Sequence, residues 1–266
     1  MQQVRAKKSL GQHFLKDLSI AQRIAQTAPA GQVLEIGPGM GVLTQYLLQR
    51  TEINLTAIEL DHESIEYLTR RKELSRFTMD ETPWQNLQLI EGDFLRLNLN
   101  ELYPDTPFAV IGNYPYNISS QIFFRVLDYK DRISVCSGLI QKEVAERLAA
   151  KPGNKTYGIL SVLLQAWYDI EYLFTVDENV FAHPPKVKSA VIRLTRNDRQ
   201  YLGCDEQLFR TVVKTAFNQR RKQMRNSLQQ LIGKGHPLLE ENIFTRRPEQ
   251  LSVEEFIDIT NKIKNS

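Results

Sequence analysis

The fold follows from the stretch Leu34-Glu35-Ile36-Gly37-Pro38-Gly39-Met40-Gly41, in which a short apolar run ends in three alternating glycines. A helical pattern follows at residues 42–50. Glycines between a strand and a helix let the backbone turn tightly and approach a ligand at the carboxyl edge of an open α/β sheet. The dinucleotide pattern G-x-G-x-x-G would need its third glycine at Val42, so a nicotinamide cofactor fits poorly.

Apolar runs of strand length recur along the chain with helical patterns between them, which predicts an α/β fold with a mostly parallel sheet. The runs cover residues 33–36, 55–60, 87–90, 108–111, 133–140, 171–176 and 187–194. The last two are placed to close the sheet with an antiparallel pair. Helical patterns lie between the runs at residues 62–74, 118–127 and 141–150.

The strand pattern stops after about residue 196, and helical patterns follow at residues 206–217, 222–232 and 252–263. This change predicts a sheet-containing domain over residues 1–197 and a small helical domain over residues 198–266.

The form E-x-G-x-G-x-G resembles the first motif of class I S-adenosylmethionine methyltransferases. Glu59 ends the second expected strand, where a carboxylate can accept hydrogen bonds from ribose hydroxyls. Asp61 is the better candidate for the helix N-cap at this place. Asp93 follows the third expected strand and can accept a hydrogen bond from the adenine amino group of the cofactor, although it also suits a plain turn. With Gly37 and Gly39, these acids predict an S-adenosylmethionine site.

The most specific sign of chemistry is Asn113-Tyr114-Pro115-Tyr116, which follows the fourth expected strand. The amino nitrogen of adenine is a poor nucleophile because its lone pair is delocalised into the ring. The Asn113 side-chain oxygen and the Tyr114 carbonyl, aimed at the amino hydrogens, would favour a tetrahedral nitrogen and stabilise its developing positive charge. Pro115 would hold the turn, and Tyr116 would offer a stacking face for an extruded base. A turn that merely closes a strand is the alternative, and the order of the preceding motifs argues against it.

Nearly the whole chain is similar to the ribosomal RNA adenine dimethyltransferases. The similarity rests on the glycine turn and on Lys8-Ser9-Leu10-Gly11-Gln12-His13-Phe14-Leu15, Asn113-Tyr114-Pro115-Tyr116-Asn117-Ile118-Ser119-Ser120, Phe181 with Pro184-Pro185-Lys186-Val187-Lys188-Ser189, and Phe217-Asn218-Gln219-Arg220-Arg221-Lys222. It implies a Rossmann-like class I fold of seven mostly parallel strands with a helical RNA-binding domain. It also implies direct methyl transfer from S-adenosylmethionine to two adjacent adenines in a hairpin near the 3′ end of small-subunit ribosomal RNA.

The resemblance extends the cofactor site to the N-terminal segment. The backbone around His13 and Leu15 would line the cofactor beside Gly37, and Asn113 would face it as well. The family often has Asn where this chain has His13, so we assign His13 no acid-base or metal-binding role.

The resemblance also implies two features of the target-base site. Phe181 would stack on the target adenine opposite Tyr116, whereas a phenylalanine in a core is the alternative. Tyr114 stands where the family more often has an aliphatic residue, a departure of little weight if only its carbonyl acts.

Basic residues are concentrated near both ends of the chain, and phosphate contact is their expected use, although a solvated surface explains such runs equally well. The clusters comprise Arg5, Lys7 and Lys8, and Arg220, Arg221, Lys222 and Arg225. The net charge of +3 is compatible with a polyanionic partner but does not prove one.

Composition narrows the remaining possibilities. With 42% hydrophobic and 24% charged residues, the chain has the composition of a globular protein that works in solution. Cys136 and Cys204 suggest neither a disulfide framework nor a metal site, which favours the cytoplasm. We expect no metal and no membrane contact, and a monomer that acts on a precursor of the small ribosomal subunit.

Two other functions stay open at this point. A related family methylates an adenine of large-subunit ribosomal RNA and confers antibiotic resistance. A non-catalytic RNA-binding or assembly factor could keep the same fold, although the presence of Glu59, Asp93 and Asn113 argues against a loss of catalysis.

Overall fold

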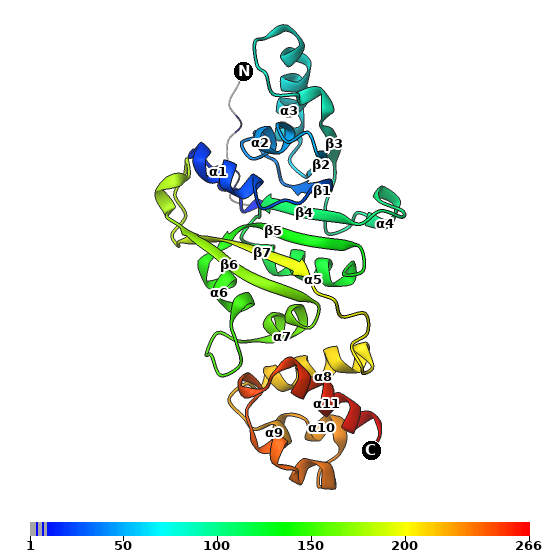
Figure 1. Cartoon of the computed structure of the whole chain (residues 1–266). Helices are drawn as coiled ribbons and strands as arrows, with labels where there is room; N and C mark the ends of the chain where they lie inside the picture. The colour runs from blue at the N-terminus through cyan, green and yellow to red at the C-terminus, as the bar shows by residue number, and fades with distance from the viewer. Residues whose placement is uncertain (1–3, 5–6, 8–9) are drawn as a thin grey trace. The chain divides into compact units, whose positions relative to one another are not determined.

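The structure, a computed structural model, describes residue 4, residue 7 and residues 10–266. The chain divides into two compact units, of which the first comprises Met1–Ala145 and Glu171–Arg196. The second comprises Glu146–Ile170 and Asn197–Ser266. The sequence predicted a single division at residue 197. The second unit also includes Glu146–Ile170, because this segment packs with the C-terminal helices. Figure 1 shows the elements of both units.

The expected strands are all present, with ends shifted by a few residues. They are β1 (Gly31–Ile36), β2 (Ile53–Glu59), β3 (Gln88–Glu91), β4 (Phe108–Asn113), β5 (Ile133–Gln141), β6 (Tyr168–Val176) and β7 (Ser189–Arg196). They form one sheet in the order β3-β2-β1-β4-β5-β7-β6. Strands β1 to β5 pair in parallel, and β7 runs antiparallel to β5. The predicted α/β class with a mostly parallel seven-stranded sheet is confirmed.

The position of the site follows from the strand order. Strand β1 pairs with β2 on one side and with β4 on the other, so the order of the chain reverses at β1. Ligands of open α/β sheets bind beside the carboxyl ends of strands at such a point. Val33–Ile36 are buried without alternation, which is typical of a strand covered on both faces.

Helices and short turns connect the strands of the first unit. The helices are α1 (Leu18–Ala25), α2 (Thr44–Leu48), α3 (His62–Leu74), α4 (Leu99–Leu102) and α5 (Ser119–Asp128), and α6 (Lys142–Ala149) follows β5. Sequence reasoning did not propose α1, whose N-cap is Asp17: the Asp17 carboxylate accepts a hydrogen bond from the Ser19 N–H at 2.9 Å. The expected helix at residues 42–50 is shorter, because Gly41 and the residues after it form turns.

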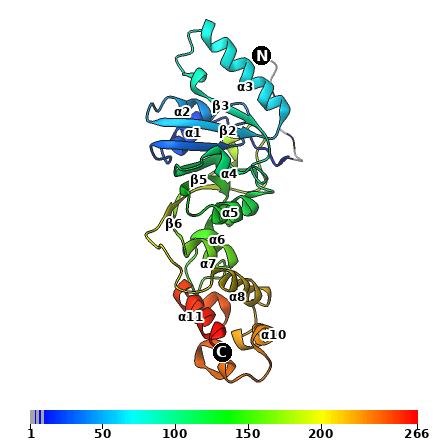
Figure 2. The same cartoon turned by 90° about the vertical axis from the view of Figure 1, so that its right-hand side faces the viewer.

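The second unit is helical, as Figure 2 shows. It contains α7 (Ile159–Gln165), α8 (Glu206–Asn218), α9 (Met224–Ser227), α10 (Gln229–Ile232), α11 (Val253–Lys264) and short 3-10 turns between α10 and α11. Its core includes the stacked rings of Phe217 and Phe256, whose centroids lie 6.0 Å apart. The expected helix at residues 222–232 is instead two short helices. Within the part of the chain that the structure describes, no helix is long and apolar enough to cross a membrane.

Candidate active site

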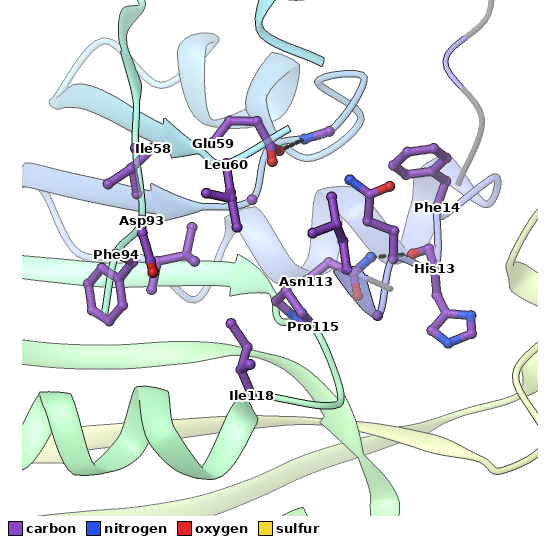
Figure 3. Close-up of a pocket in the computed structure, with 17 residues that line it drawn as sticks. His13, Phe14, Ile58, Glu59, Leu60, Asp93, Phe94, Asn113, Pro115 and Ile118 are labelled. Carbon is purple, nitrogen blue, oxygen red and sulfur yellow. Dashed lines mark hydrogen bonds between the residues drawn. The ribbon is translucent and has the colours of Figure 1, made fainter. Parts of the chain in front are cut away.

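A pocket opens at the carboxyl ends of β1, β2, β3 and β4, bordered by the N-terminal segment (Figure 3). Its free space, open solvent included, is about 670 Å³. The pocket brings together most of the predicted cofactor residues and Pro115. These are His13, Gly37, Gly39, Glu59, Asp93 and Asn113.

The glycine turn after β1 needs glycine for two different reasons. Gly37 and Gly39 have φ values of 66° and 55°, which residues with a side chain rarely adopt. A Cβ atom on Gly39 would lie 2.8 Å from the Phe14 ring, whereas one on Gly37 would meet nothing within 4 Å. Gly39 therefore allows the N-terminal segment to pack closely, and Gly37 leaves open space for a ligand beside the backbone.

Glu59 lies at the end of β2, and its carboxylate is fixed by the backbone. It accepts hydrogen bonds from the N–H groups of Gly39 at 3.0 Å and Asp61 at 2.9 Å. Burial raises the pKa of Glu59 above its ordinary value, and these N–H groups oppose the shift. Each carboxylate oxygen keeps a lone pair for a further donor, so Glu59 can also accept hydrogen bonds from hydroxyls in the pocket.

Glu35, which sequence reasoning did not assign to the site, is a second buried acid beside the glycine turn. Burial raises the pKa of Glu35 to about 8, and the negative charge of Glu59 adds to this shift. Glu35 is therefore mostly protonated at neutral pH. Hydrogen bonds from the N–H groups of Gly39 and Asp61 favour the charged form of Glu59, so Glu59 is the better candidate for an anionic acceptor.

Asp93 combines the two roles that its sequence allows. One carboxylate oxygen accepts a hydrogen bond from the Leu95 N–H at 2.9 Å, which stabilises the turn after β3. The other lies 3.5 Å from the Arg96 guanidinium. Because Asp93 also lines the pocket, it can accept a hydrogen bond from a ligand.

Asn113 ends β4 with its side-chain amide held in one orientation (Figure 3). Its Nδ2 donates a hydrogen bond of 2.6 Å to the main-chain carbonyl of His13. The amide nitrogen is thereby engaged, and Oδ1 remains an acceptor. The Asn113 side chain can therefore accept a hydrogen bond from an amino group in the pocket.

The next residues connect this acceptor to the rest of the sheet. The Tyr114 ring is buried, and its N–H donates to the Leu139 carbonyl at 3.0 Å. Pro115 lines the pocket. The Tyr116 hydroxyl is hydrogen-bonded to Ser189 Oγ of β7, and burial raises the pKa of Tyr116 to about 12. The Tyr116 ring is thus fixed at its outer end.

Comparison with known proteins assigns the family. A family model described as ribosomal RNA adenine dimethylase matches residues 3–265. The chain belongs to this family. A protein of Parabacteroides distasonis named ribosomal RNA small subunit methyltransferase A is 62% identical over 98% of this chain and 94% of its own length. A protein of the same name in Bacteroides thetaiotaomicron is 58% identical over 100% of this chain and 97% of its own length.

Solved structures agree with the adenine dimethylase fold. A dimethyladenosine transferase from Plasmodium falciparum matches 95% of this chain and 98% of its own with a TM-score of 0.79 at 22% identity. The 23S rRNA methyltransferase ErmE matches 93% of this chain and 99% of its own with a TM-score of 0.65 at 26% identity. The class I methyltransferase fold and the S-adenosylmethionine cofactor predicted from the sequence are confirmed for this family.

Two residues expected in the adenine dimethylase site, Phe181 and Leu15, are buried beside the main pocket. Phe181 is fully buried, because Leu15 forms a β-bridge with it and the Ala182 N–H donates to the Phe14 carbonyl at 2.9 Å. Leu15 is buried as well and borders a small cavity next to the main pocket. The N-terminal segment thus covers the ring that was expected to stack on a base, and this stacking stays a prediction.

His13 lies where the target base was expected. Its ring centroid is 4.9 Å from that of Tyr116 and 6.2 Å from that of Phe181. Its Nδ1 lies 3.3 Å from the His183 carbonyl. A base that stacks between Tyr116 and Phe181 would therefore have to displace the His13 side chain.

Sequence reasoning missed much of the apolar wall of the pocket. The missed residues are Leu10, Gly11, Gln12, Phe14, Ile36, Ile58, Leu60, Gly92, Phe94 and Ile118. Ile58 and Leu60 flank Glu59 in the sequence, and Phe94 follows Asp93. Their positions next to the predicted acids could therefore have indicated that they line the pocket. The packing of residues 10–14 on the glycine turn is a long-range contact without a local signal.

The basic residues have unequal surroundings. The Lys7 ammonium lies 2.6 Å from Asp61 and 3.0 Å from Glu63, so it is paired with two acids. The N-cap residue Asp61 uses its side chain for this pair and for Ser64 rather than for the helix backbone. Arg5 and Lys8 lie outside the described residues.

In the second unit, Arg221 and Lys222 are exposed and line a groove with Arg247. Amide and hydroxyl side chains complete the lining, and among the described residues no acid contributes to it. The amide and hydroxyl residues are Gln223, Asn226, Gln229, Thr245 and Gln250. The Arg220 guanidinium is hydrogen-bonded to the Lys155 carbonyl, and Arg225 Nε donates to Gln223 Oε1 at 2.8 Å. The groove is therefore cationic and rich in hydrogen-bonding groups.

Proposed function

We propose that this chain transfers methyl groups from S-adenosylmethionine to the amino nitrogens of two adjacent adenines in a hairpin near the 3′ end of small-subunit ribosomal RNA. The observation that carries the proposal is the amide of Asn113, whose nitrogen is held by the His13 carbonyl, so that its oxygen can accept a hydrogen bond in the pocket that Glu59 also lines. The names of the relatives that are 58–62% identical support the choice of the small subunit.

The residues of the pocket suit the cofactor. Glu59 would accept hydrogen bonds from the ribose hydroxyls, Asp93 would accept one from the adenine amino group, and Gly37 would leave room for the methionine part. Ile58 and Leu60 offer apolar contacts beside Glu59. S-adenosylmethionine, when bound, supplies the electrophilic methyl group of its sulfonium.

The protein's own contribution is to position and polarise the target amino group. Asn113 Oδ1 and the Tyr114 carbonyl accept hydrogen bonds from its two hydrogens, which favours a tetrahedral nitrogen with an available lone pair. The same acceptors stabilise the positive charge that develops on nitrogen during transfer. After the first transfer the cationic nitrogen releases one proton to water, so the monomethylated product keeps one N–H and one acceptor still acts in the second transfer. Pro115 and Tyr116 hold the turn and the base, and the proposal invokes no metal.

The helical unit would hold the RNA. Arg221, Lys222 and Arg247 would contact phosphates in their groove, with Arg220 and Arg225 at its margin. The substrate would be a precursor of the small subunit, and the protein would act as a cytoplasmic monomer. Lys7 and Lys8 would approach the RNA from the N-terminal segment, and Lys7 would first have to leave Asp61.

Transfer of labelled methyl groups to isolated ribosomal subunits tests the proposal. Label from S-adenosylmethionine should enter the RNA of small subunits from a strain that lacks this activity, and large subunits should stay unlabelled. Label in large-subunit RNA would favour the related resistance family, and label in neither subunit would overturn the proposal.

A further inference from the structure

The Tyr114 side chain makes specific buried contacts, in addition to the role proposed for the Tyr114 carbonyl. The residue is 1% exposed, and its hydroxyl donates a hydrogen bond of 2.7 Å to the Ser137 carbonyl of β5. The Cys136 sulfur lies 3.4 Å from the same hydroxyl. The ring meets Phe123 edge to face, with centroids 6.2 Å apart. Burial raises the pKa of Tyr114 well above its ordinary value, so the hydroxyl stays a donor.

The two neighbouring strands provide a slot for this ring. Gly112 of β4 pairs with Gly138 of β5. A Cβ atom on Gly138 would lie 2.1 Å from the Gly112 carbonyl oxygen and 2.9 Å from the Tyr114 ring. One on Gly112 would lie 2.7 Å from the Ile36 carbonyl oxygen and 3.0 Å from the ring. Side chains at these positions would fill the space that the tyrosine occupies.

Tyr114 is thus attached to β5 at two points. Its main-chain N–H donates to the Leu139 carbonyl at 3.0 Å, and its side-chain hydroxyl donates to the Ser137 carbonyl two residues earlier. Two attachments to one strand restrict both rotation and translation of the peptide between Tyr114 and Pro115. A single attachment would leave the peptide able to tilt.

We propose that the buried Tyr114 side chain is a positioning residue, which fixes the Tyr114 carbonyl and the adjoining Asn113 amide against the target amino group. The inference rests on the proposed function, because the acceptor pair belongs to that mechanism. Its physical basis is that catalytic groups must be held within a fraction of an ångström by the packing of their neighbours. A displacement of about 1 Å can cost about a hundredfold in rate.

The substitution Tyr114→Phe tests the inference because it removes the second attachment and keeps the ring in its slot. We expect single-turnover methyl transfer to small subunits to slow about tenfold at saturating substrates. The affinities for S-adenosylmethionine and for the subunit should stay within about twofold. Tyr103→Phe is the matched control, since it removes a buried hydroxyl near the opposite end of β4, and its rate should stay unchanged.

The outcomes separate this inference from its alternatives. A Tyr114→Phe rate equal to that of the unmodified protein would overturn it. A parallel loss of rate and of both affinities would indicate a merely structural tyrosine, and would overturn it as well. Tyr114→Leu should reduce the rate further, and if that variant does not fold, Tyr114→Phe still decides. Failure of the unmodified protein to methylate small subunits would instead contradict the proposed function.

Discussion

The pocket at the edge of the sheet and the groove of the helical unit are built in different ways. Glu59 and Asn113 are held by hydrogen bonds to the backbone of other segments. Arg221 and Lys222 are exposed on the surface of the groove. Buried polar groups with fixed partners act in a single geometry, whereas exposed cations contribute mainly through their charge. We therefore expect changes in the pocket to have large, specific effects and changes in the groove to have smaller, salt-dependent effects.

The largest effect is expected at Asn113. Asn113→Ala removes the acceptor and should slow single-turnover methyl transfer by about a hundredfold or more, as the loss of one oxyanion-hole donor does. Affinity for the small subunit should stay nearly unchanged, because the groove is intact. Asn86→Ala, at the opposite end of the sheet, is the matched control. A barely altered rate would contradict the role of the acceptor pair. It would also contradict the expected difference between the pocket and the groove.

Glu59 should show the next largest effect. A hydrogen bond to a charged acceptor contributes about 1.5 to 3 kcal/mol, so Glu59→Ala should weaken cofactor binding roughly ten- to a hundredfold. Calorimetry with S-adenosylmethionine measures this, with Glu52→Ala at the other end of β2 as control. If a folded Glu59→Ala variant binds with unchanged affinity, Glu59 does not contact the ribose.

The buried Glu35 should make the free energy of unfolding depend on pH. Its pKa is raised from 4.5 to about 8 in the folded protein. Its stabilising contribution is thus fully present below pH 4.5 and is lost as the pH rises through 8. Glu35→Gln stays neutral, so its stability relative to the unmodified protein should improve by up to about 1.4 kcal/mol per pH unit in this window. Denaturant unfolding at several pH values measures this, and the exposed Glu81→Gln should show no such trend.

The smallest effect per residue is expected in the groove. Charge reversal of Arg221 and Lys222 should weaken binding to the small subunit and reduce the salt dependence by about one unit of slope per lost phosphate contact. Cofactor affinity should not change. Lys234→Glu, exposed in the same unit but outside the groove, is the control. An unaltered slope would indicate that the RNA binds elsewhere, for example at the N-terminal basic residues.

Sequence reasoning was most accurate where the signal is local. The seven strands follow from apolar runs, and helix α3 was expected at the residues where it forms. Gly37, Gly39, Glu59, Asp93 and Asn113 were found because each lies at the end of a strand or in the turn just after it, and parallel strands bring their carboxyl ends to one edge. The pattern of residue types was therefore sufficient to place them in one pocket.

The features that were missed depend on contacts between distant segments. The N-terminal segment covers Phe181, because Leu15 forms a β-bridge with it. No local sequence pattern predicts this contact between distant segments. The expected continuous helix at residues 222–232 is interrupted at Leu228, where apolar spacing alone still fits a helix. The raised pKa of Glu35 depends mainly on its burial in the folded protein and to a smaller extent on Glu59, which a neighbouring strand brings close.

The most direct test of the central claim is the identity of the product. Small-subunit RNA, incubated with the protein and S-adenosylmethionine, is digested to nucleosides and analysed by mass spectrometry. We expect two dimethyladenosines per RNA molecule, both within the hairpin near the 3′ end. The absence of dimethyladenosine from small-subunit RNA, with the protein folded and the cofactor bound, would contradict this claim.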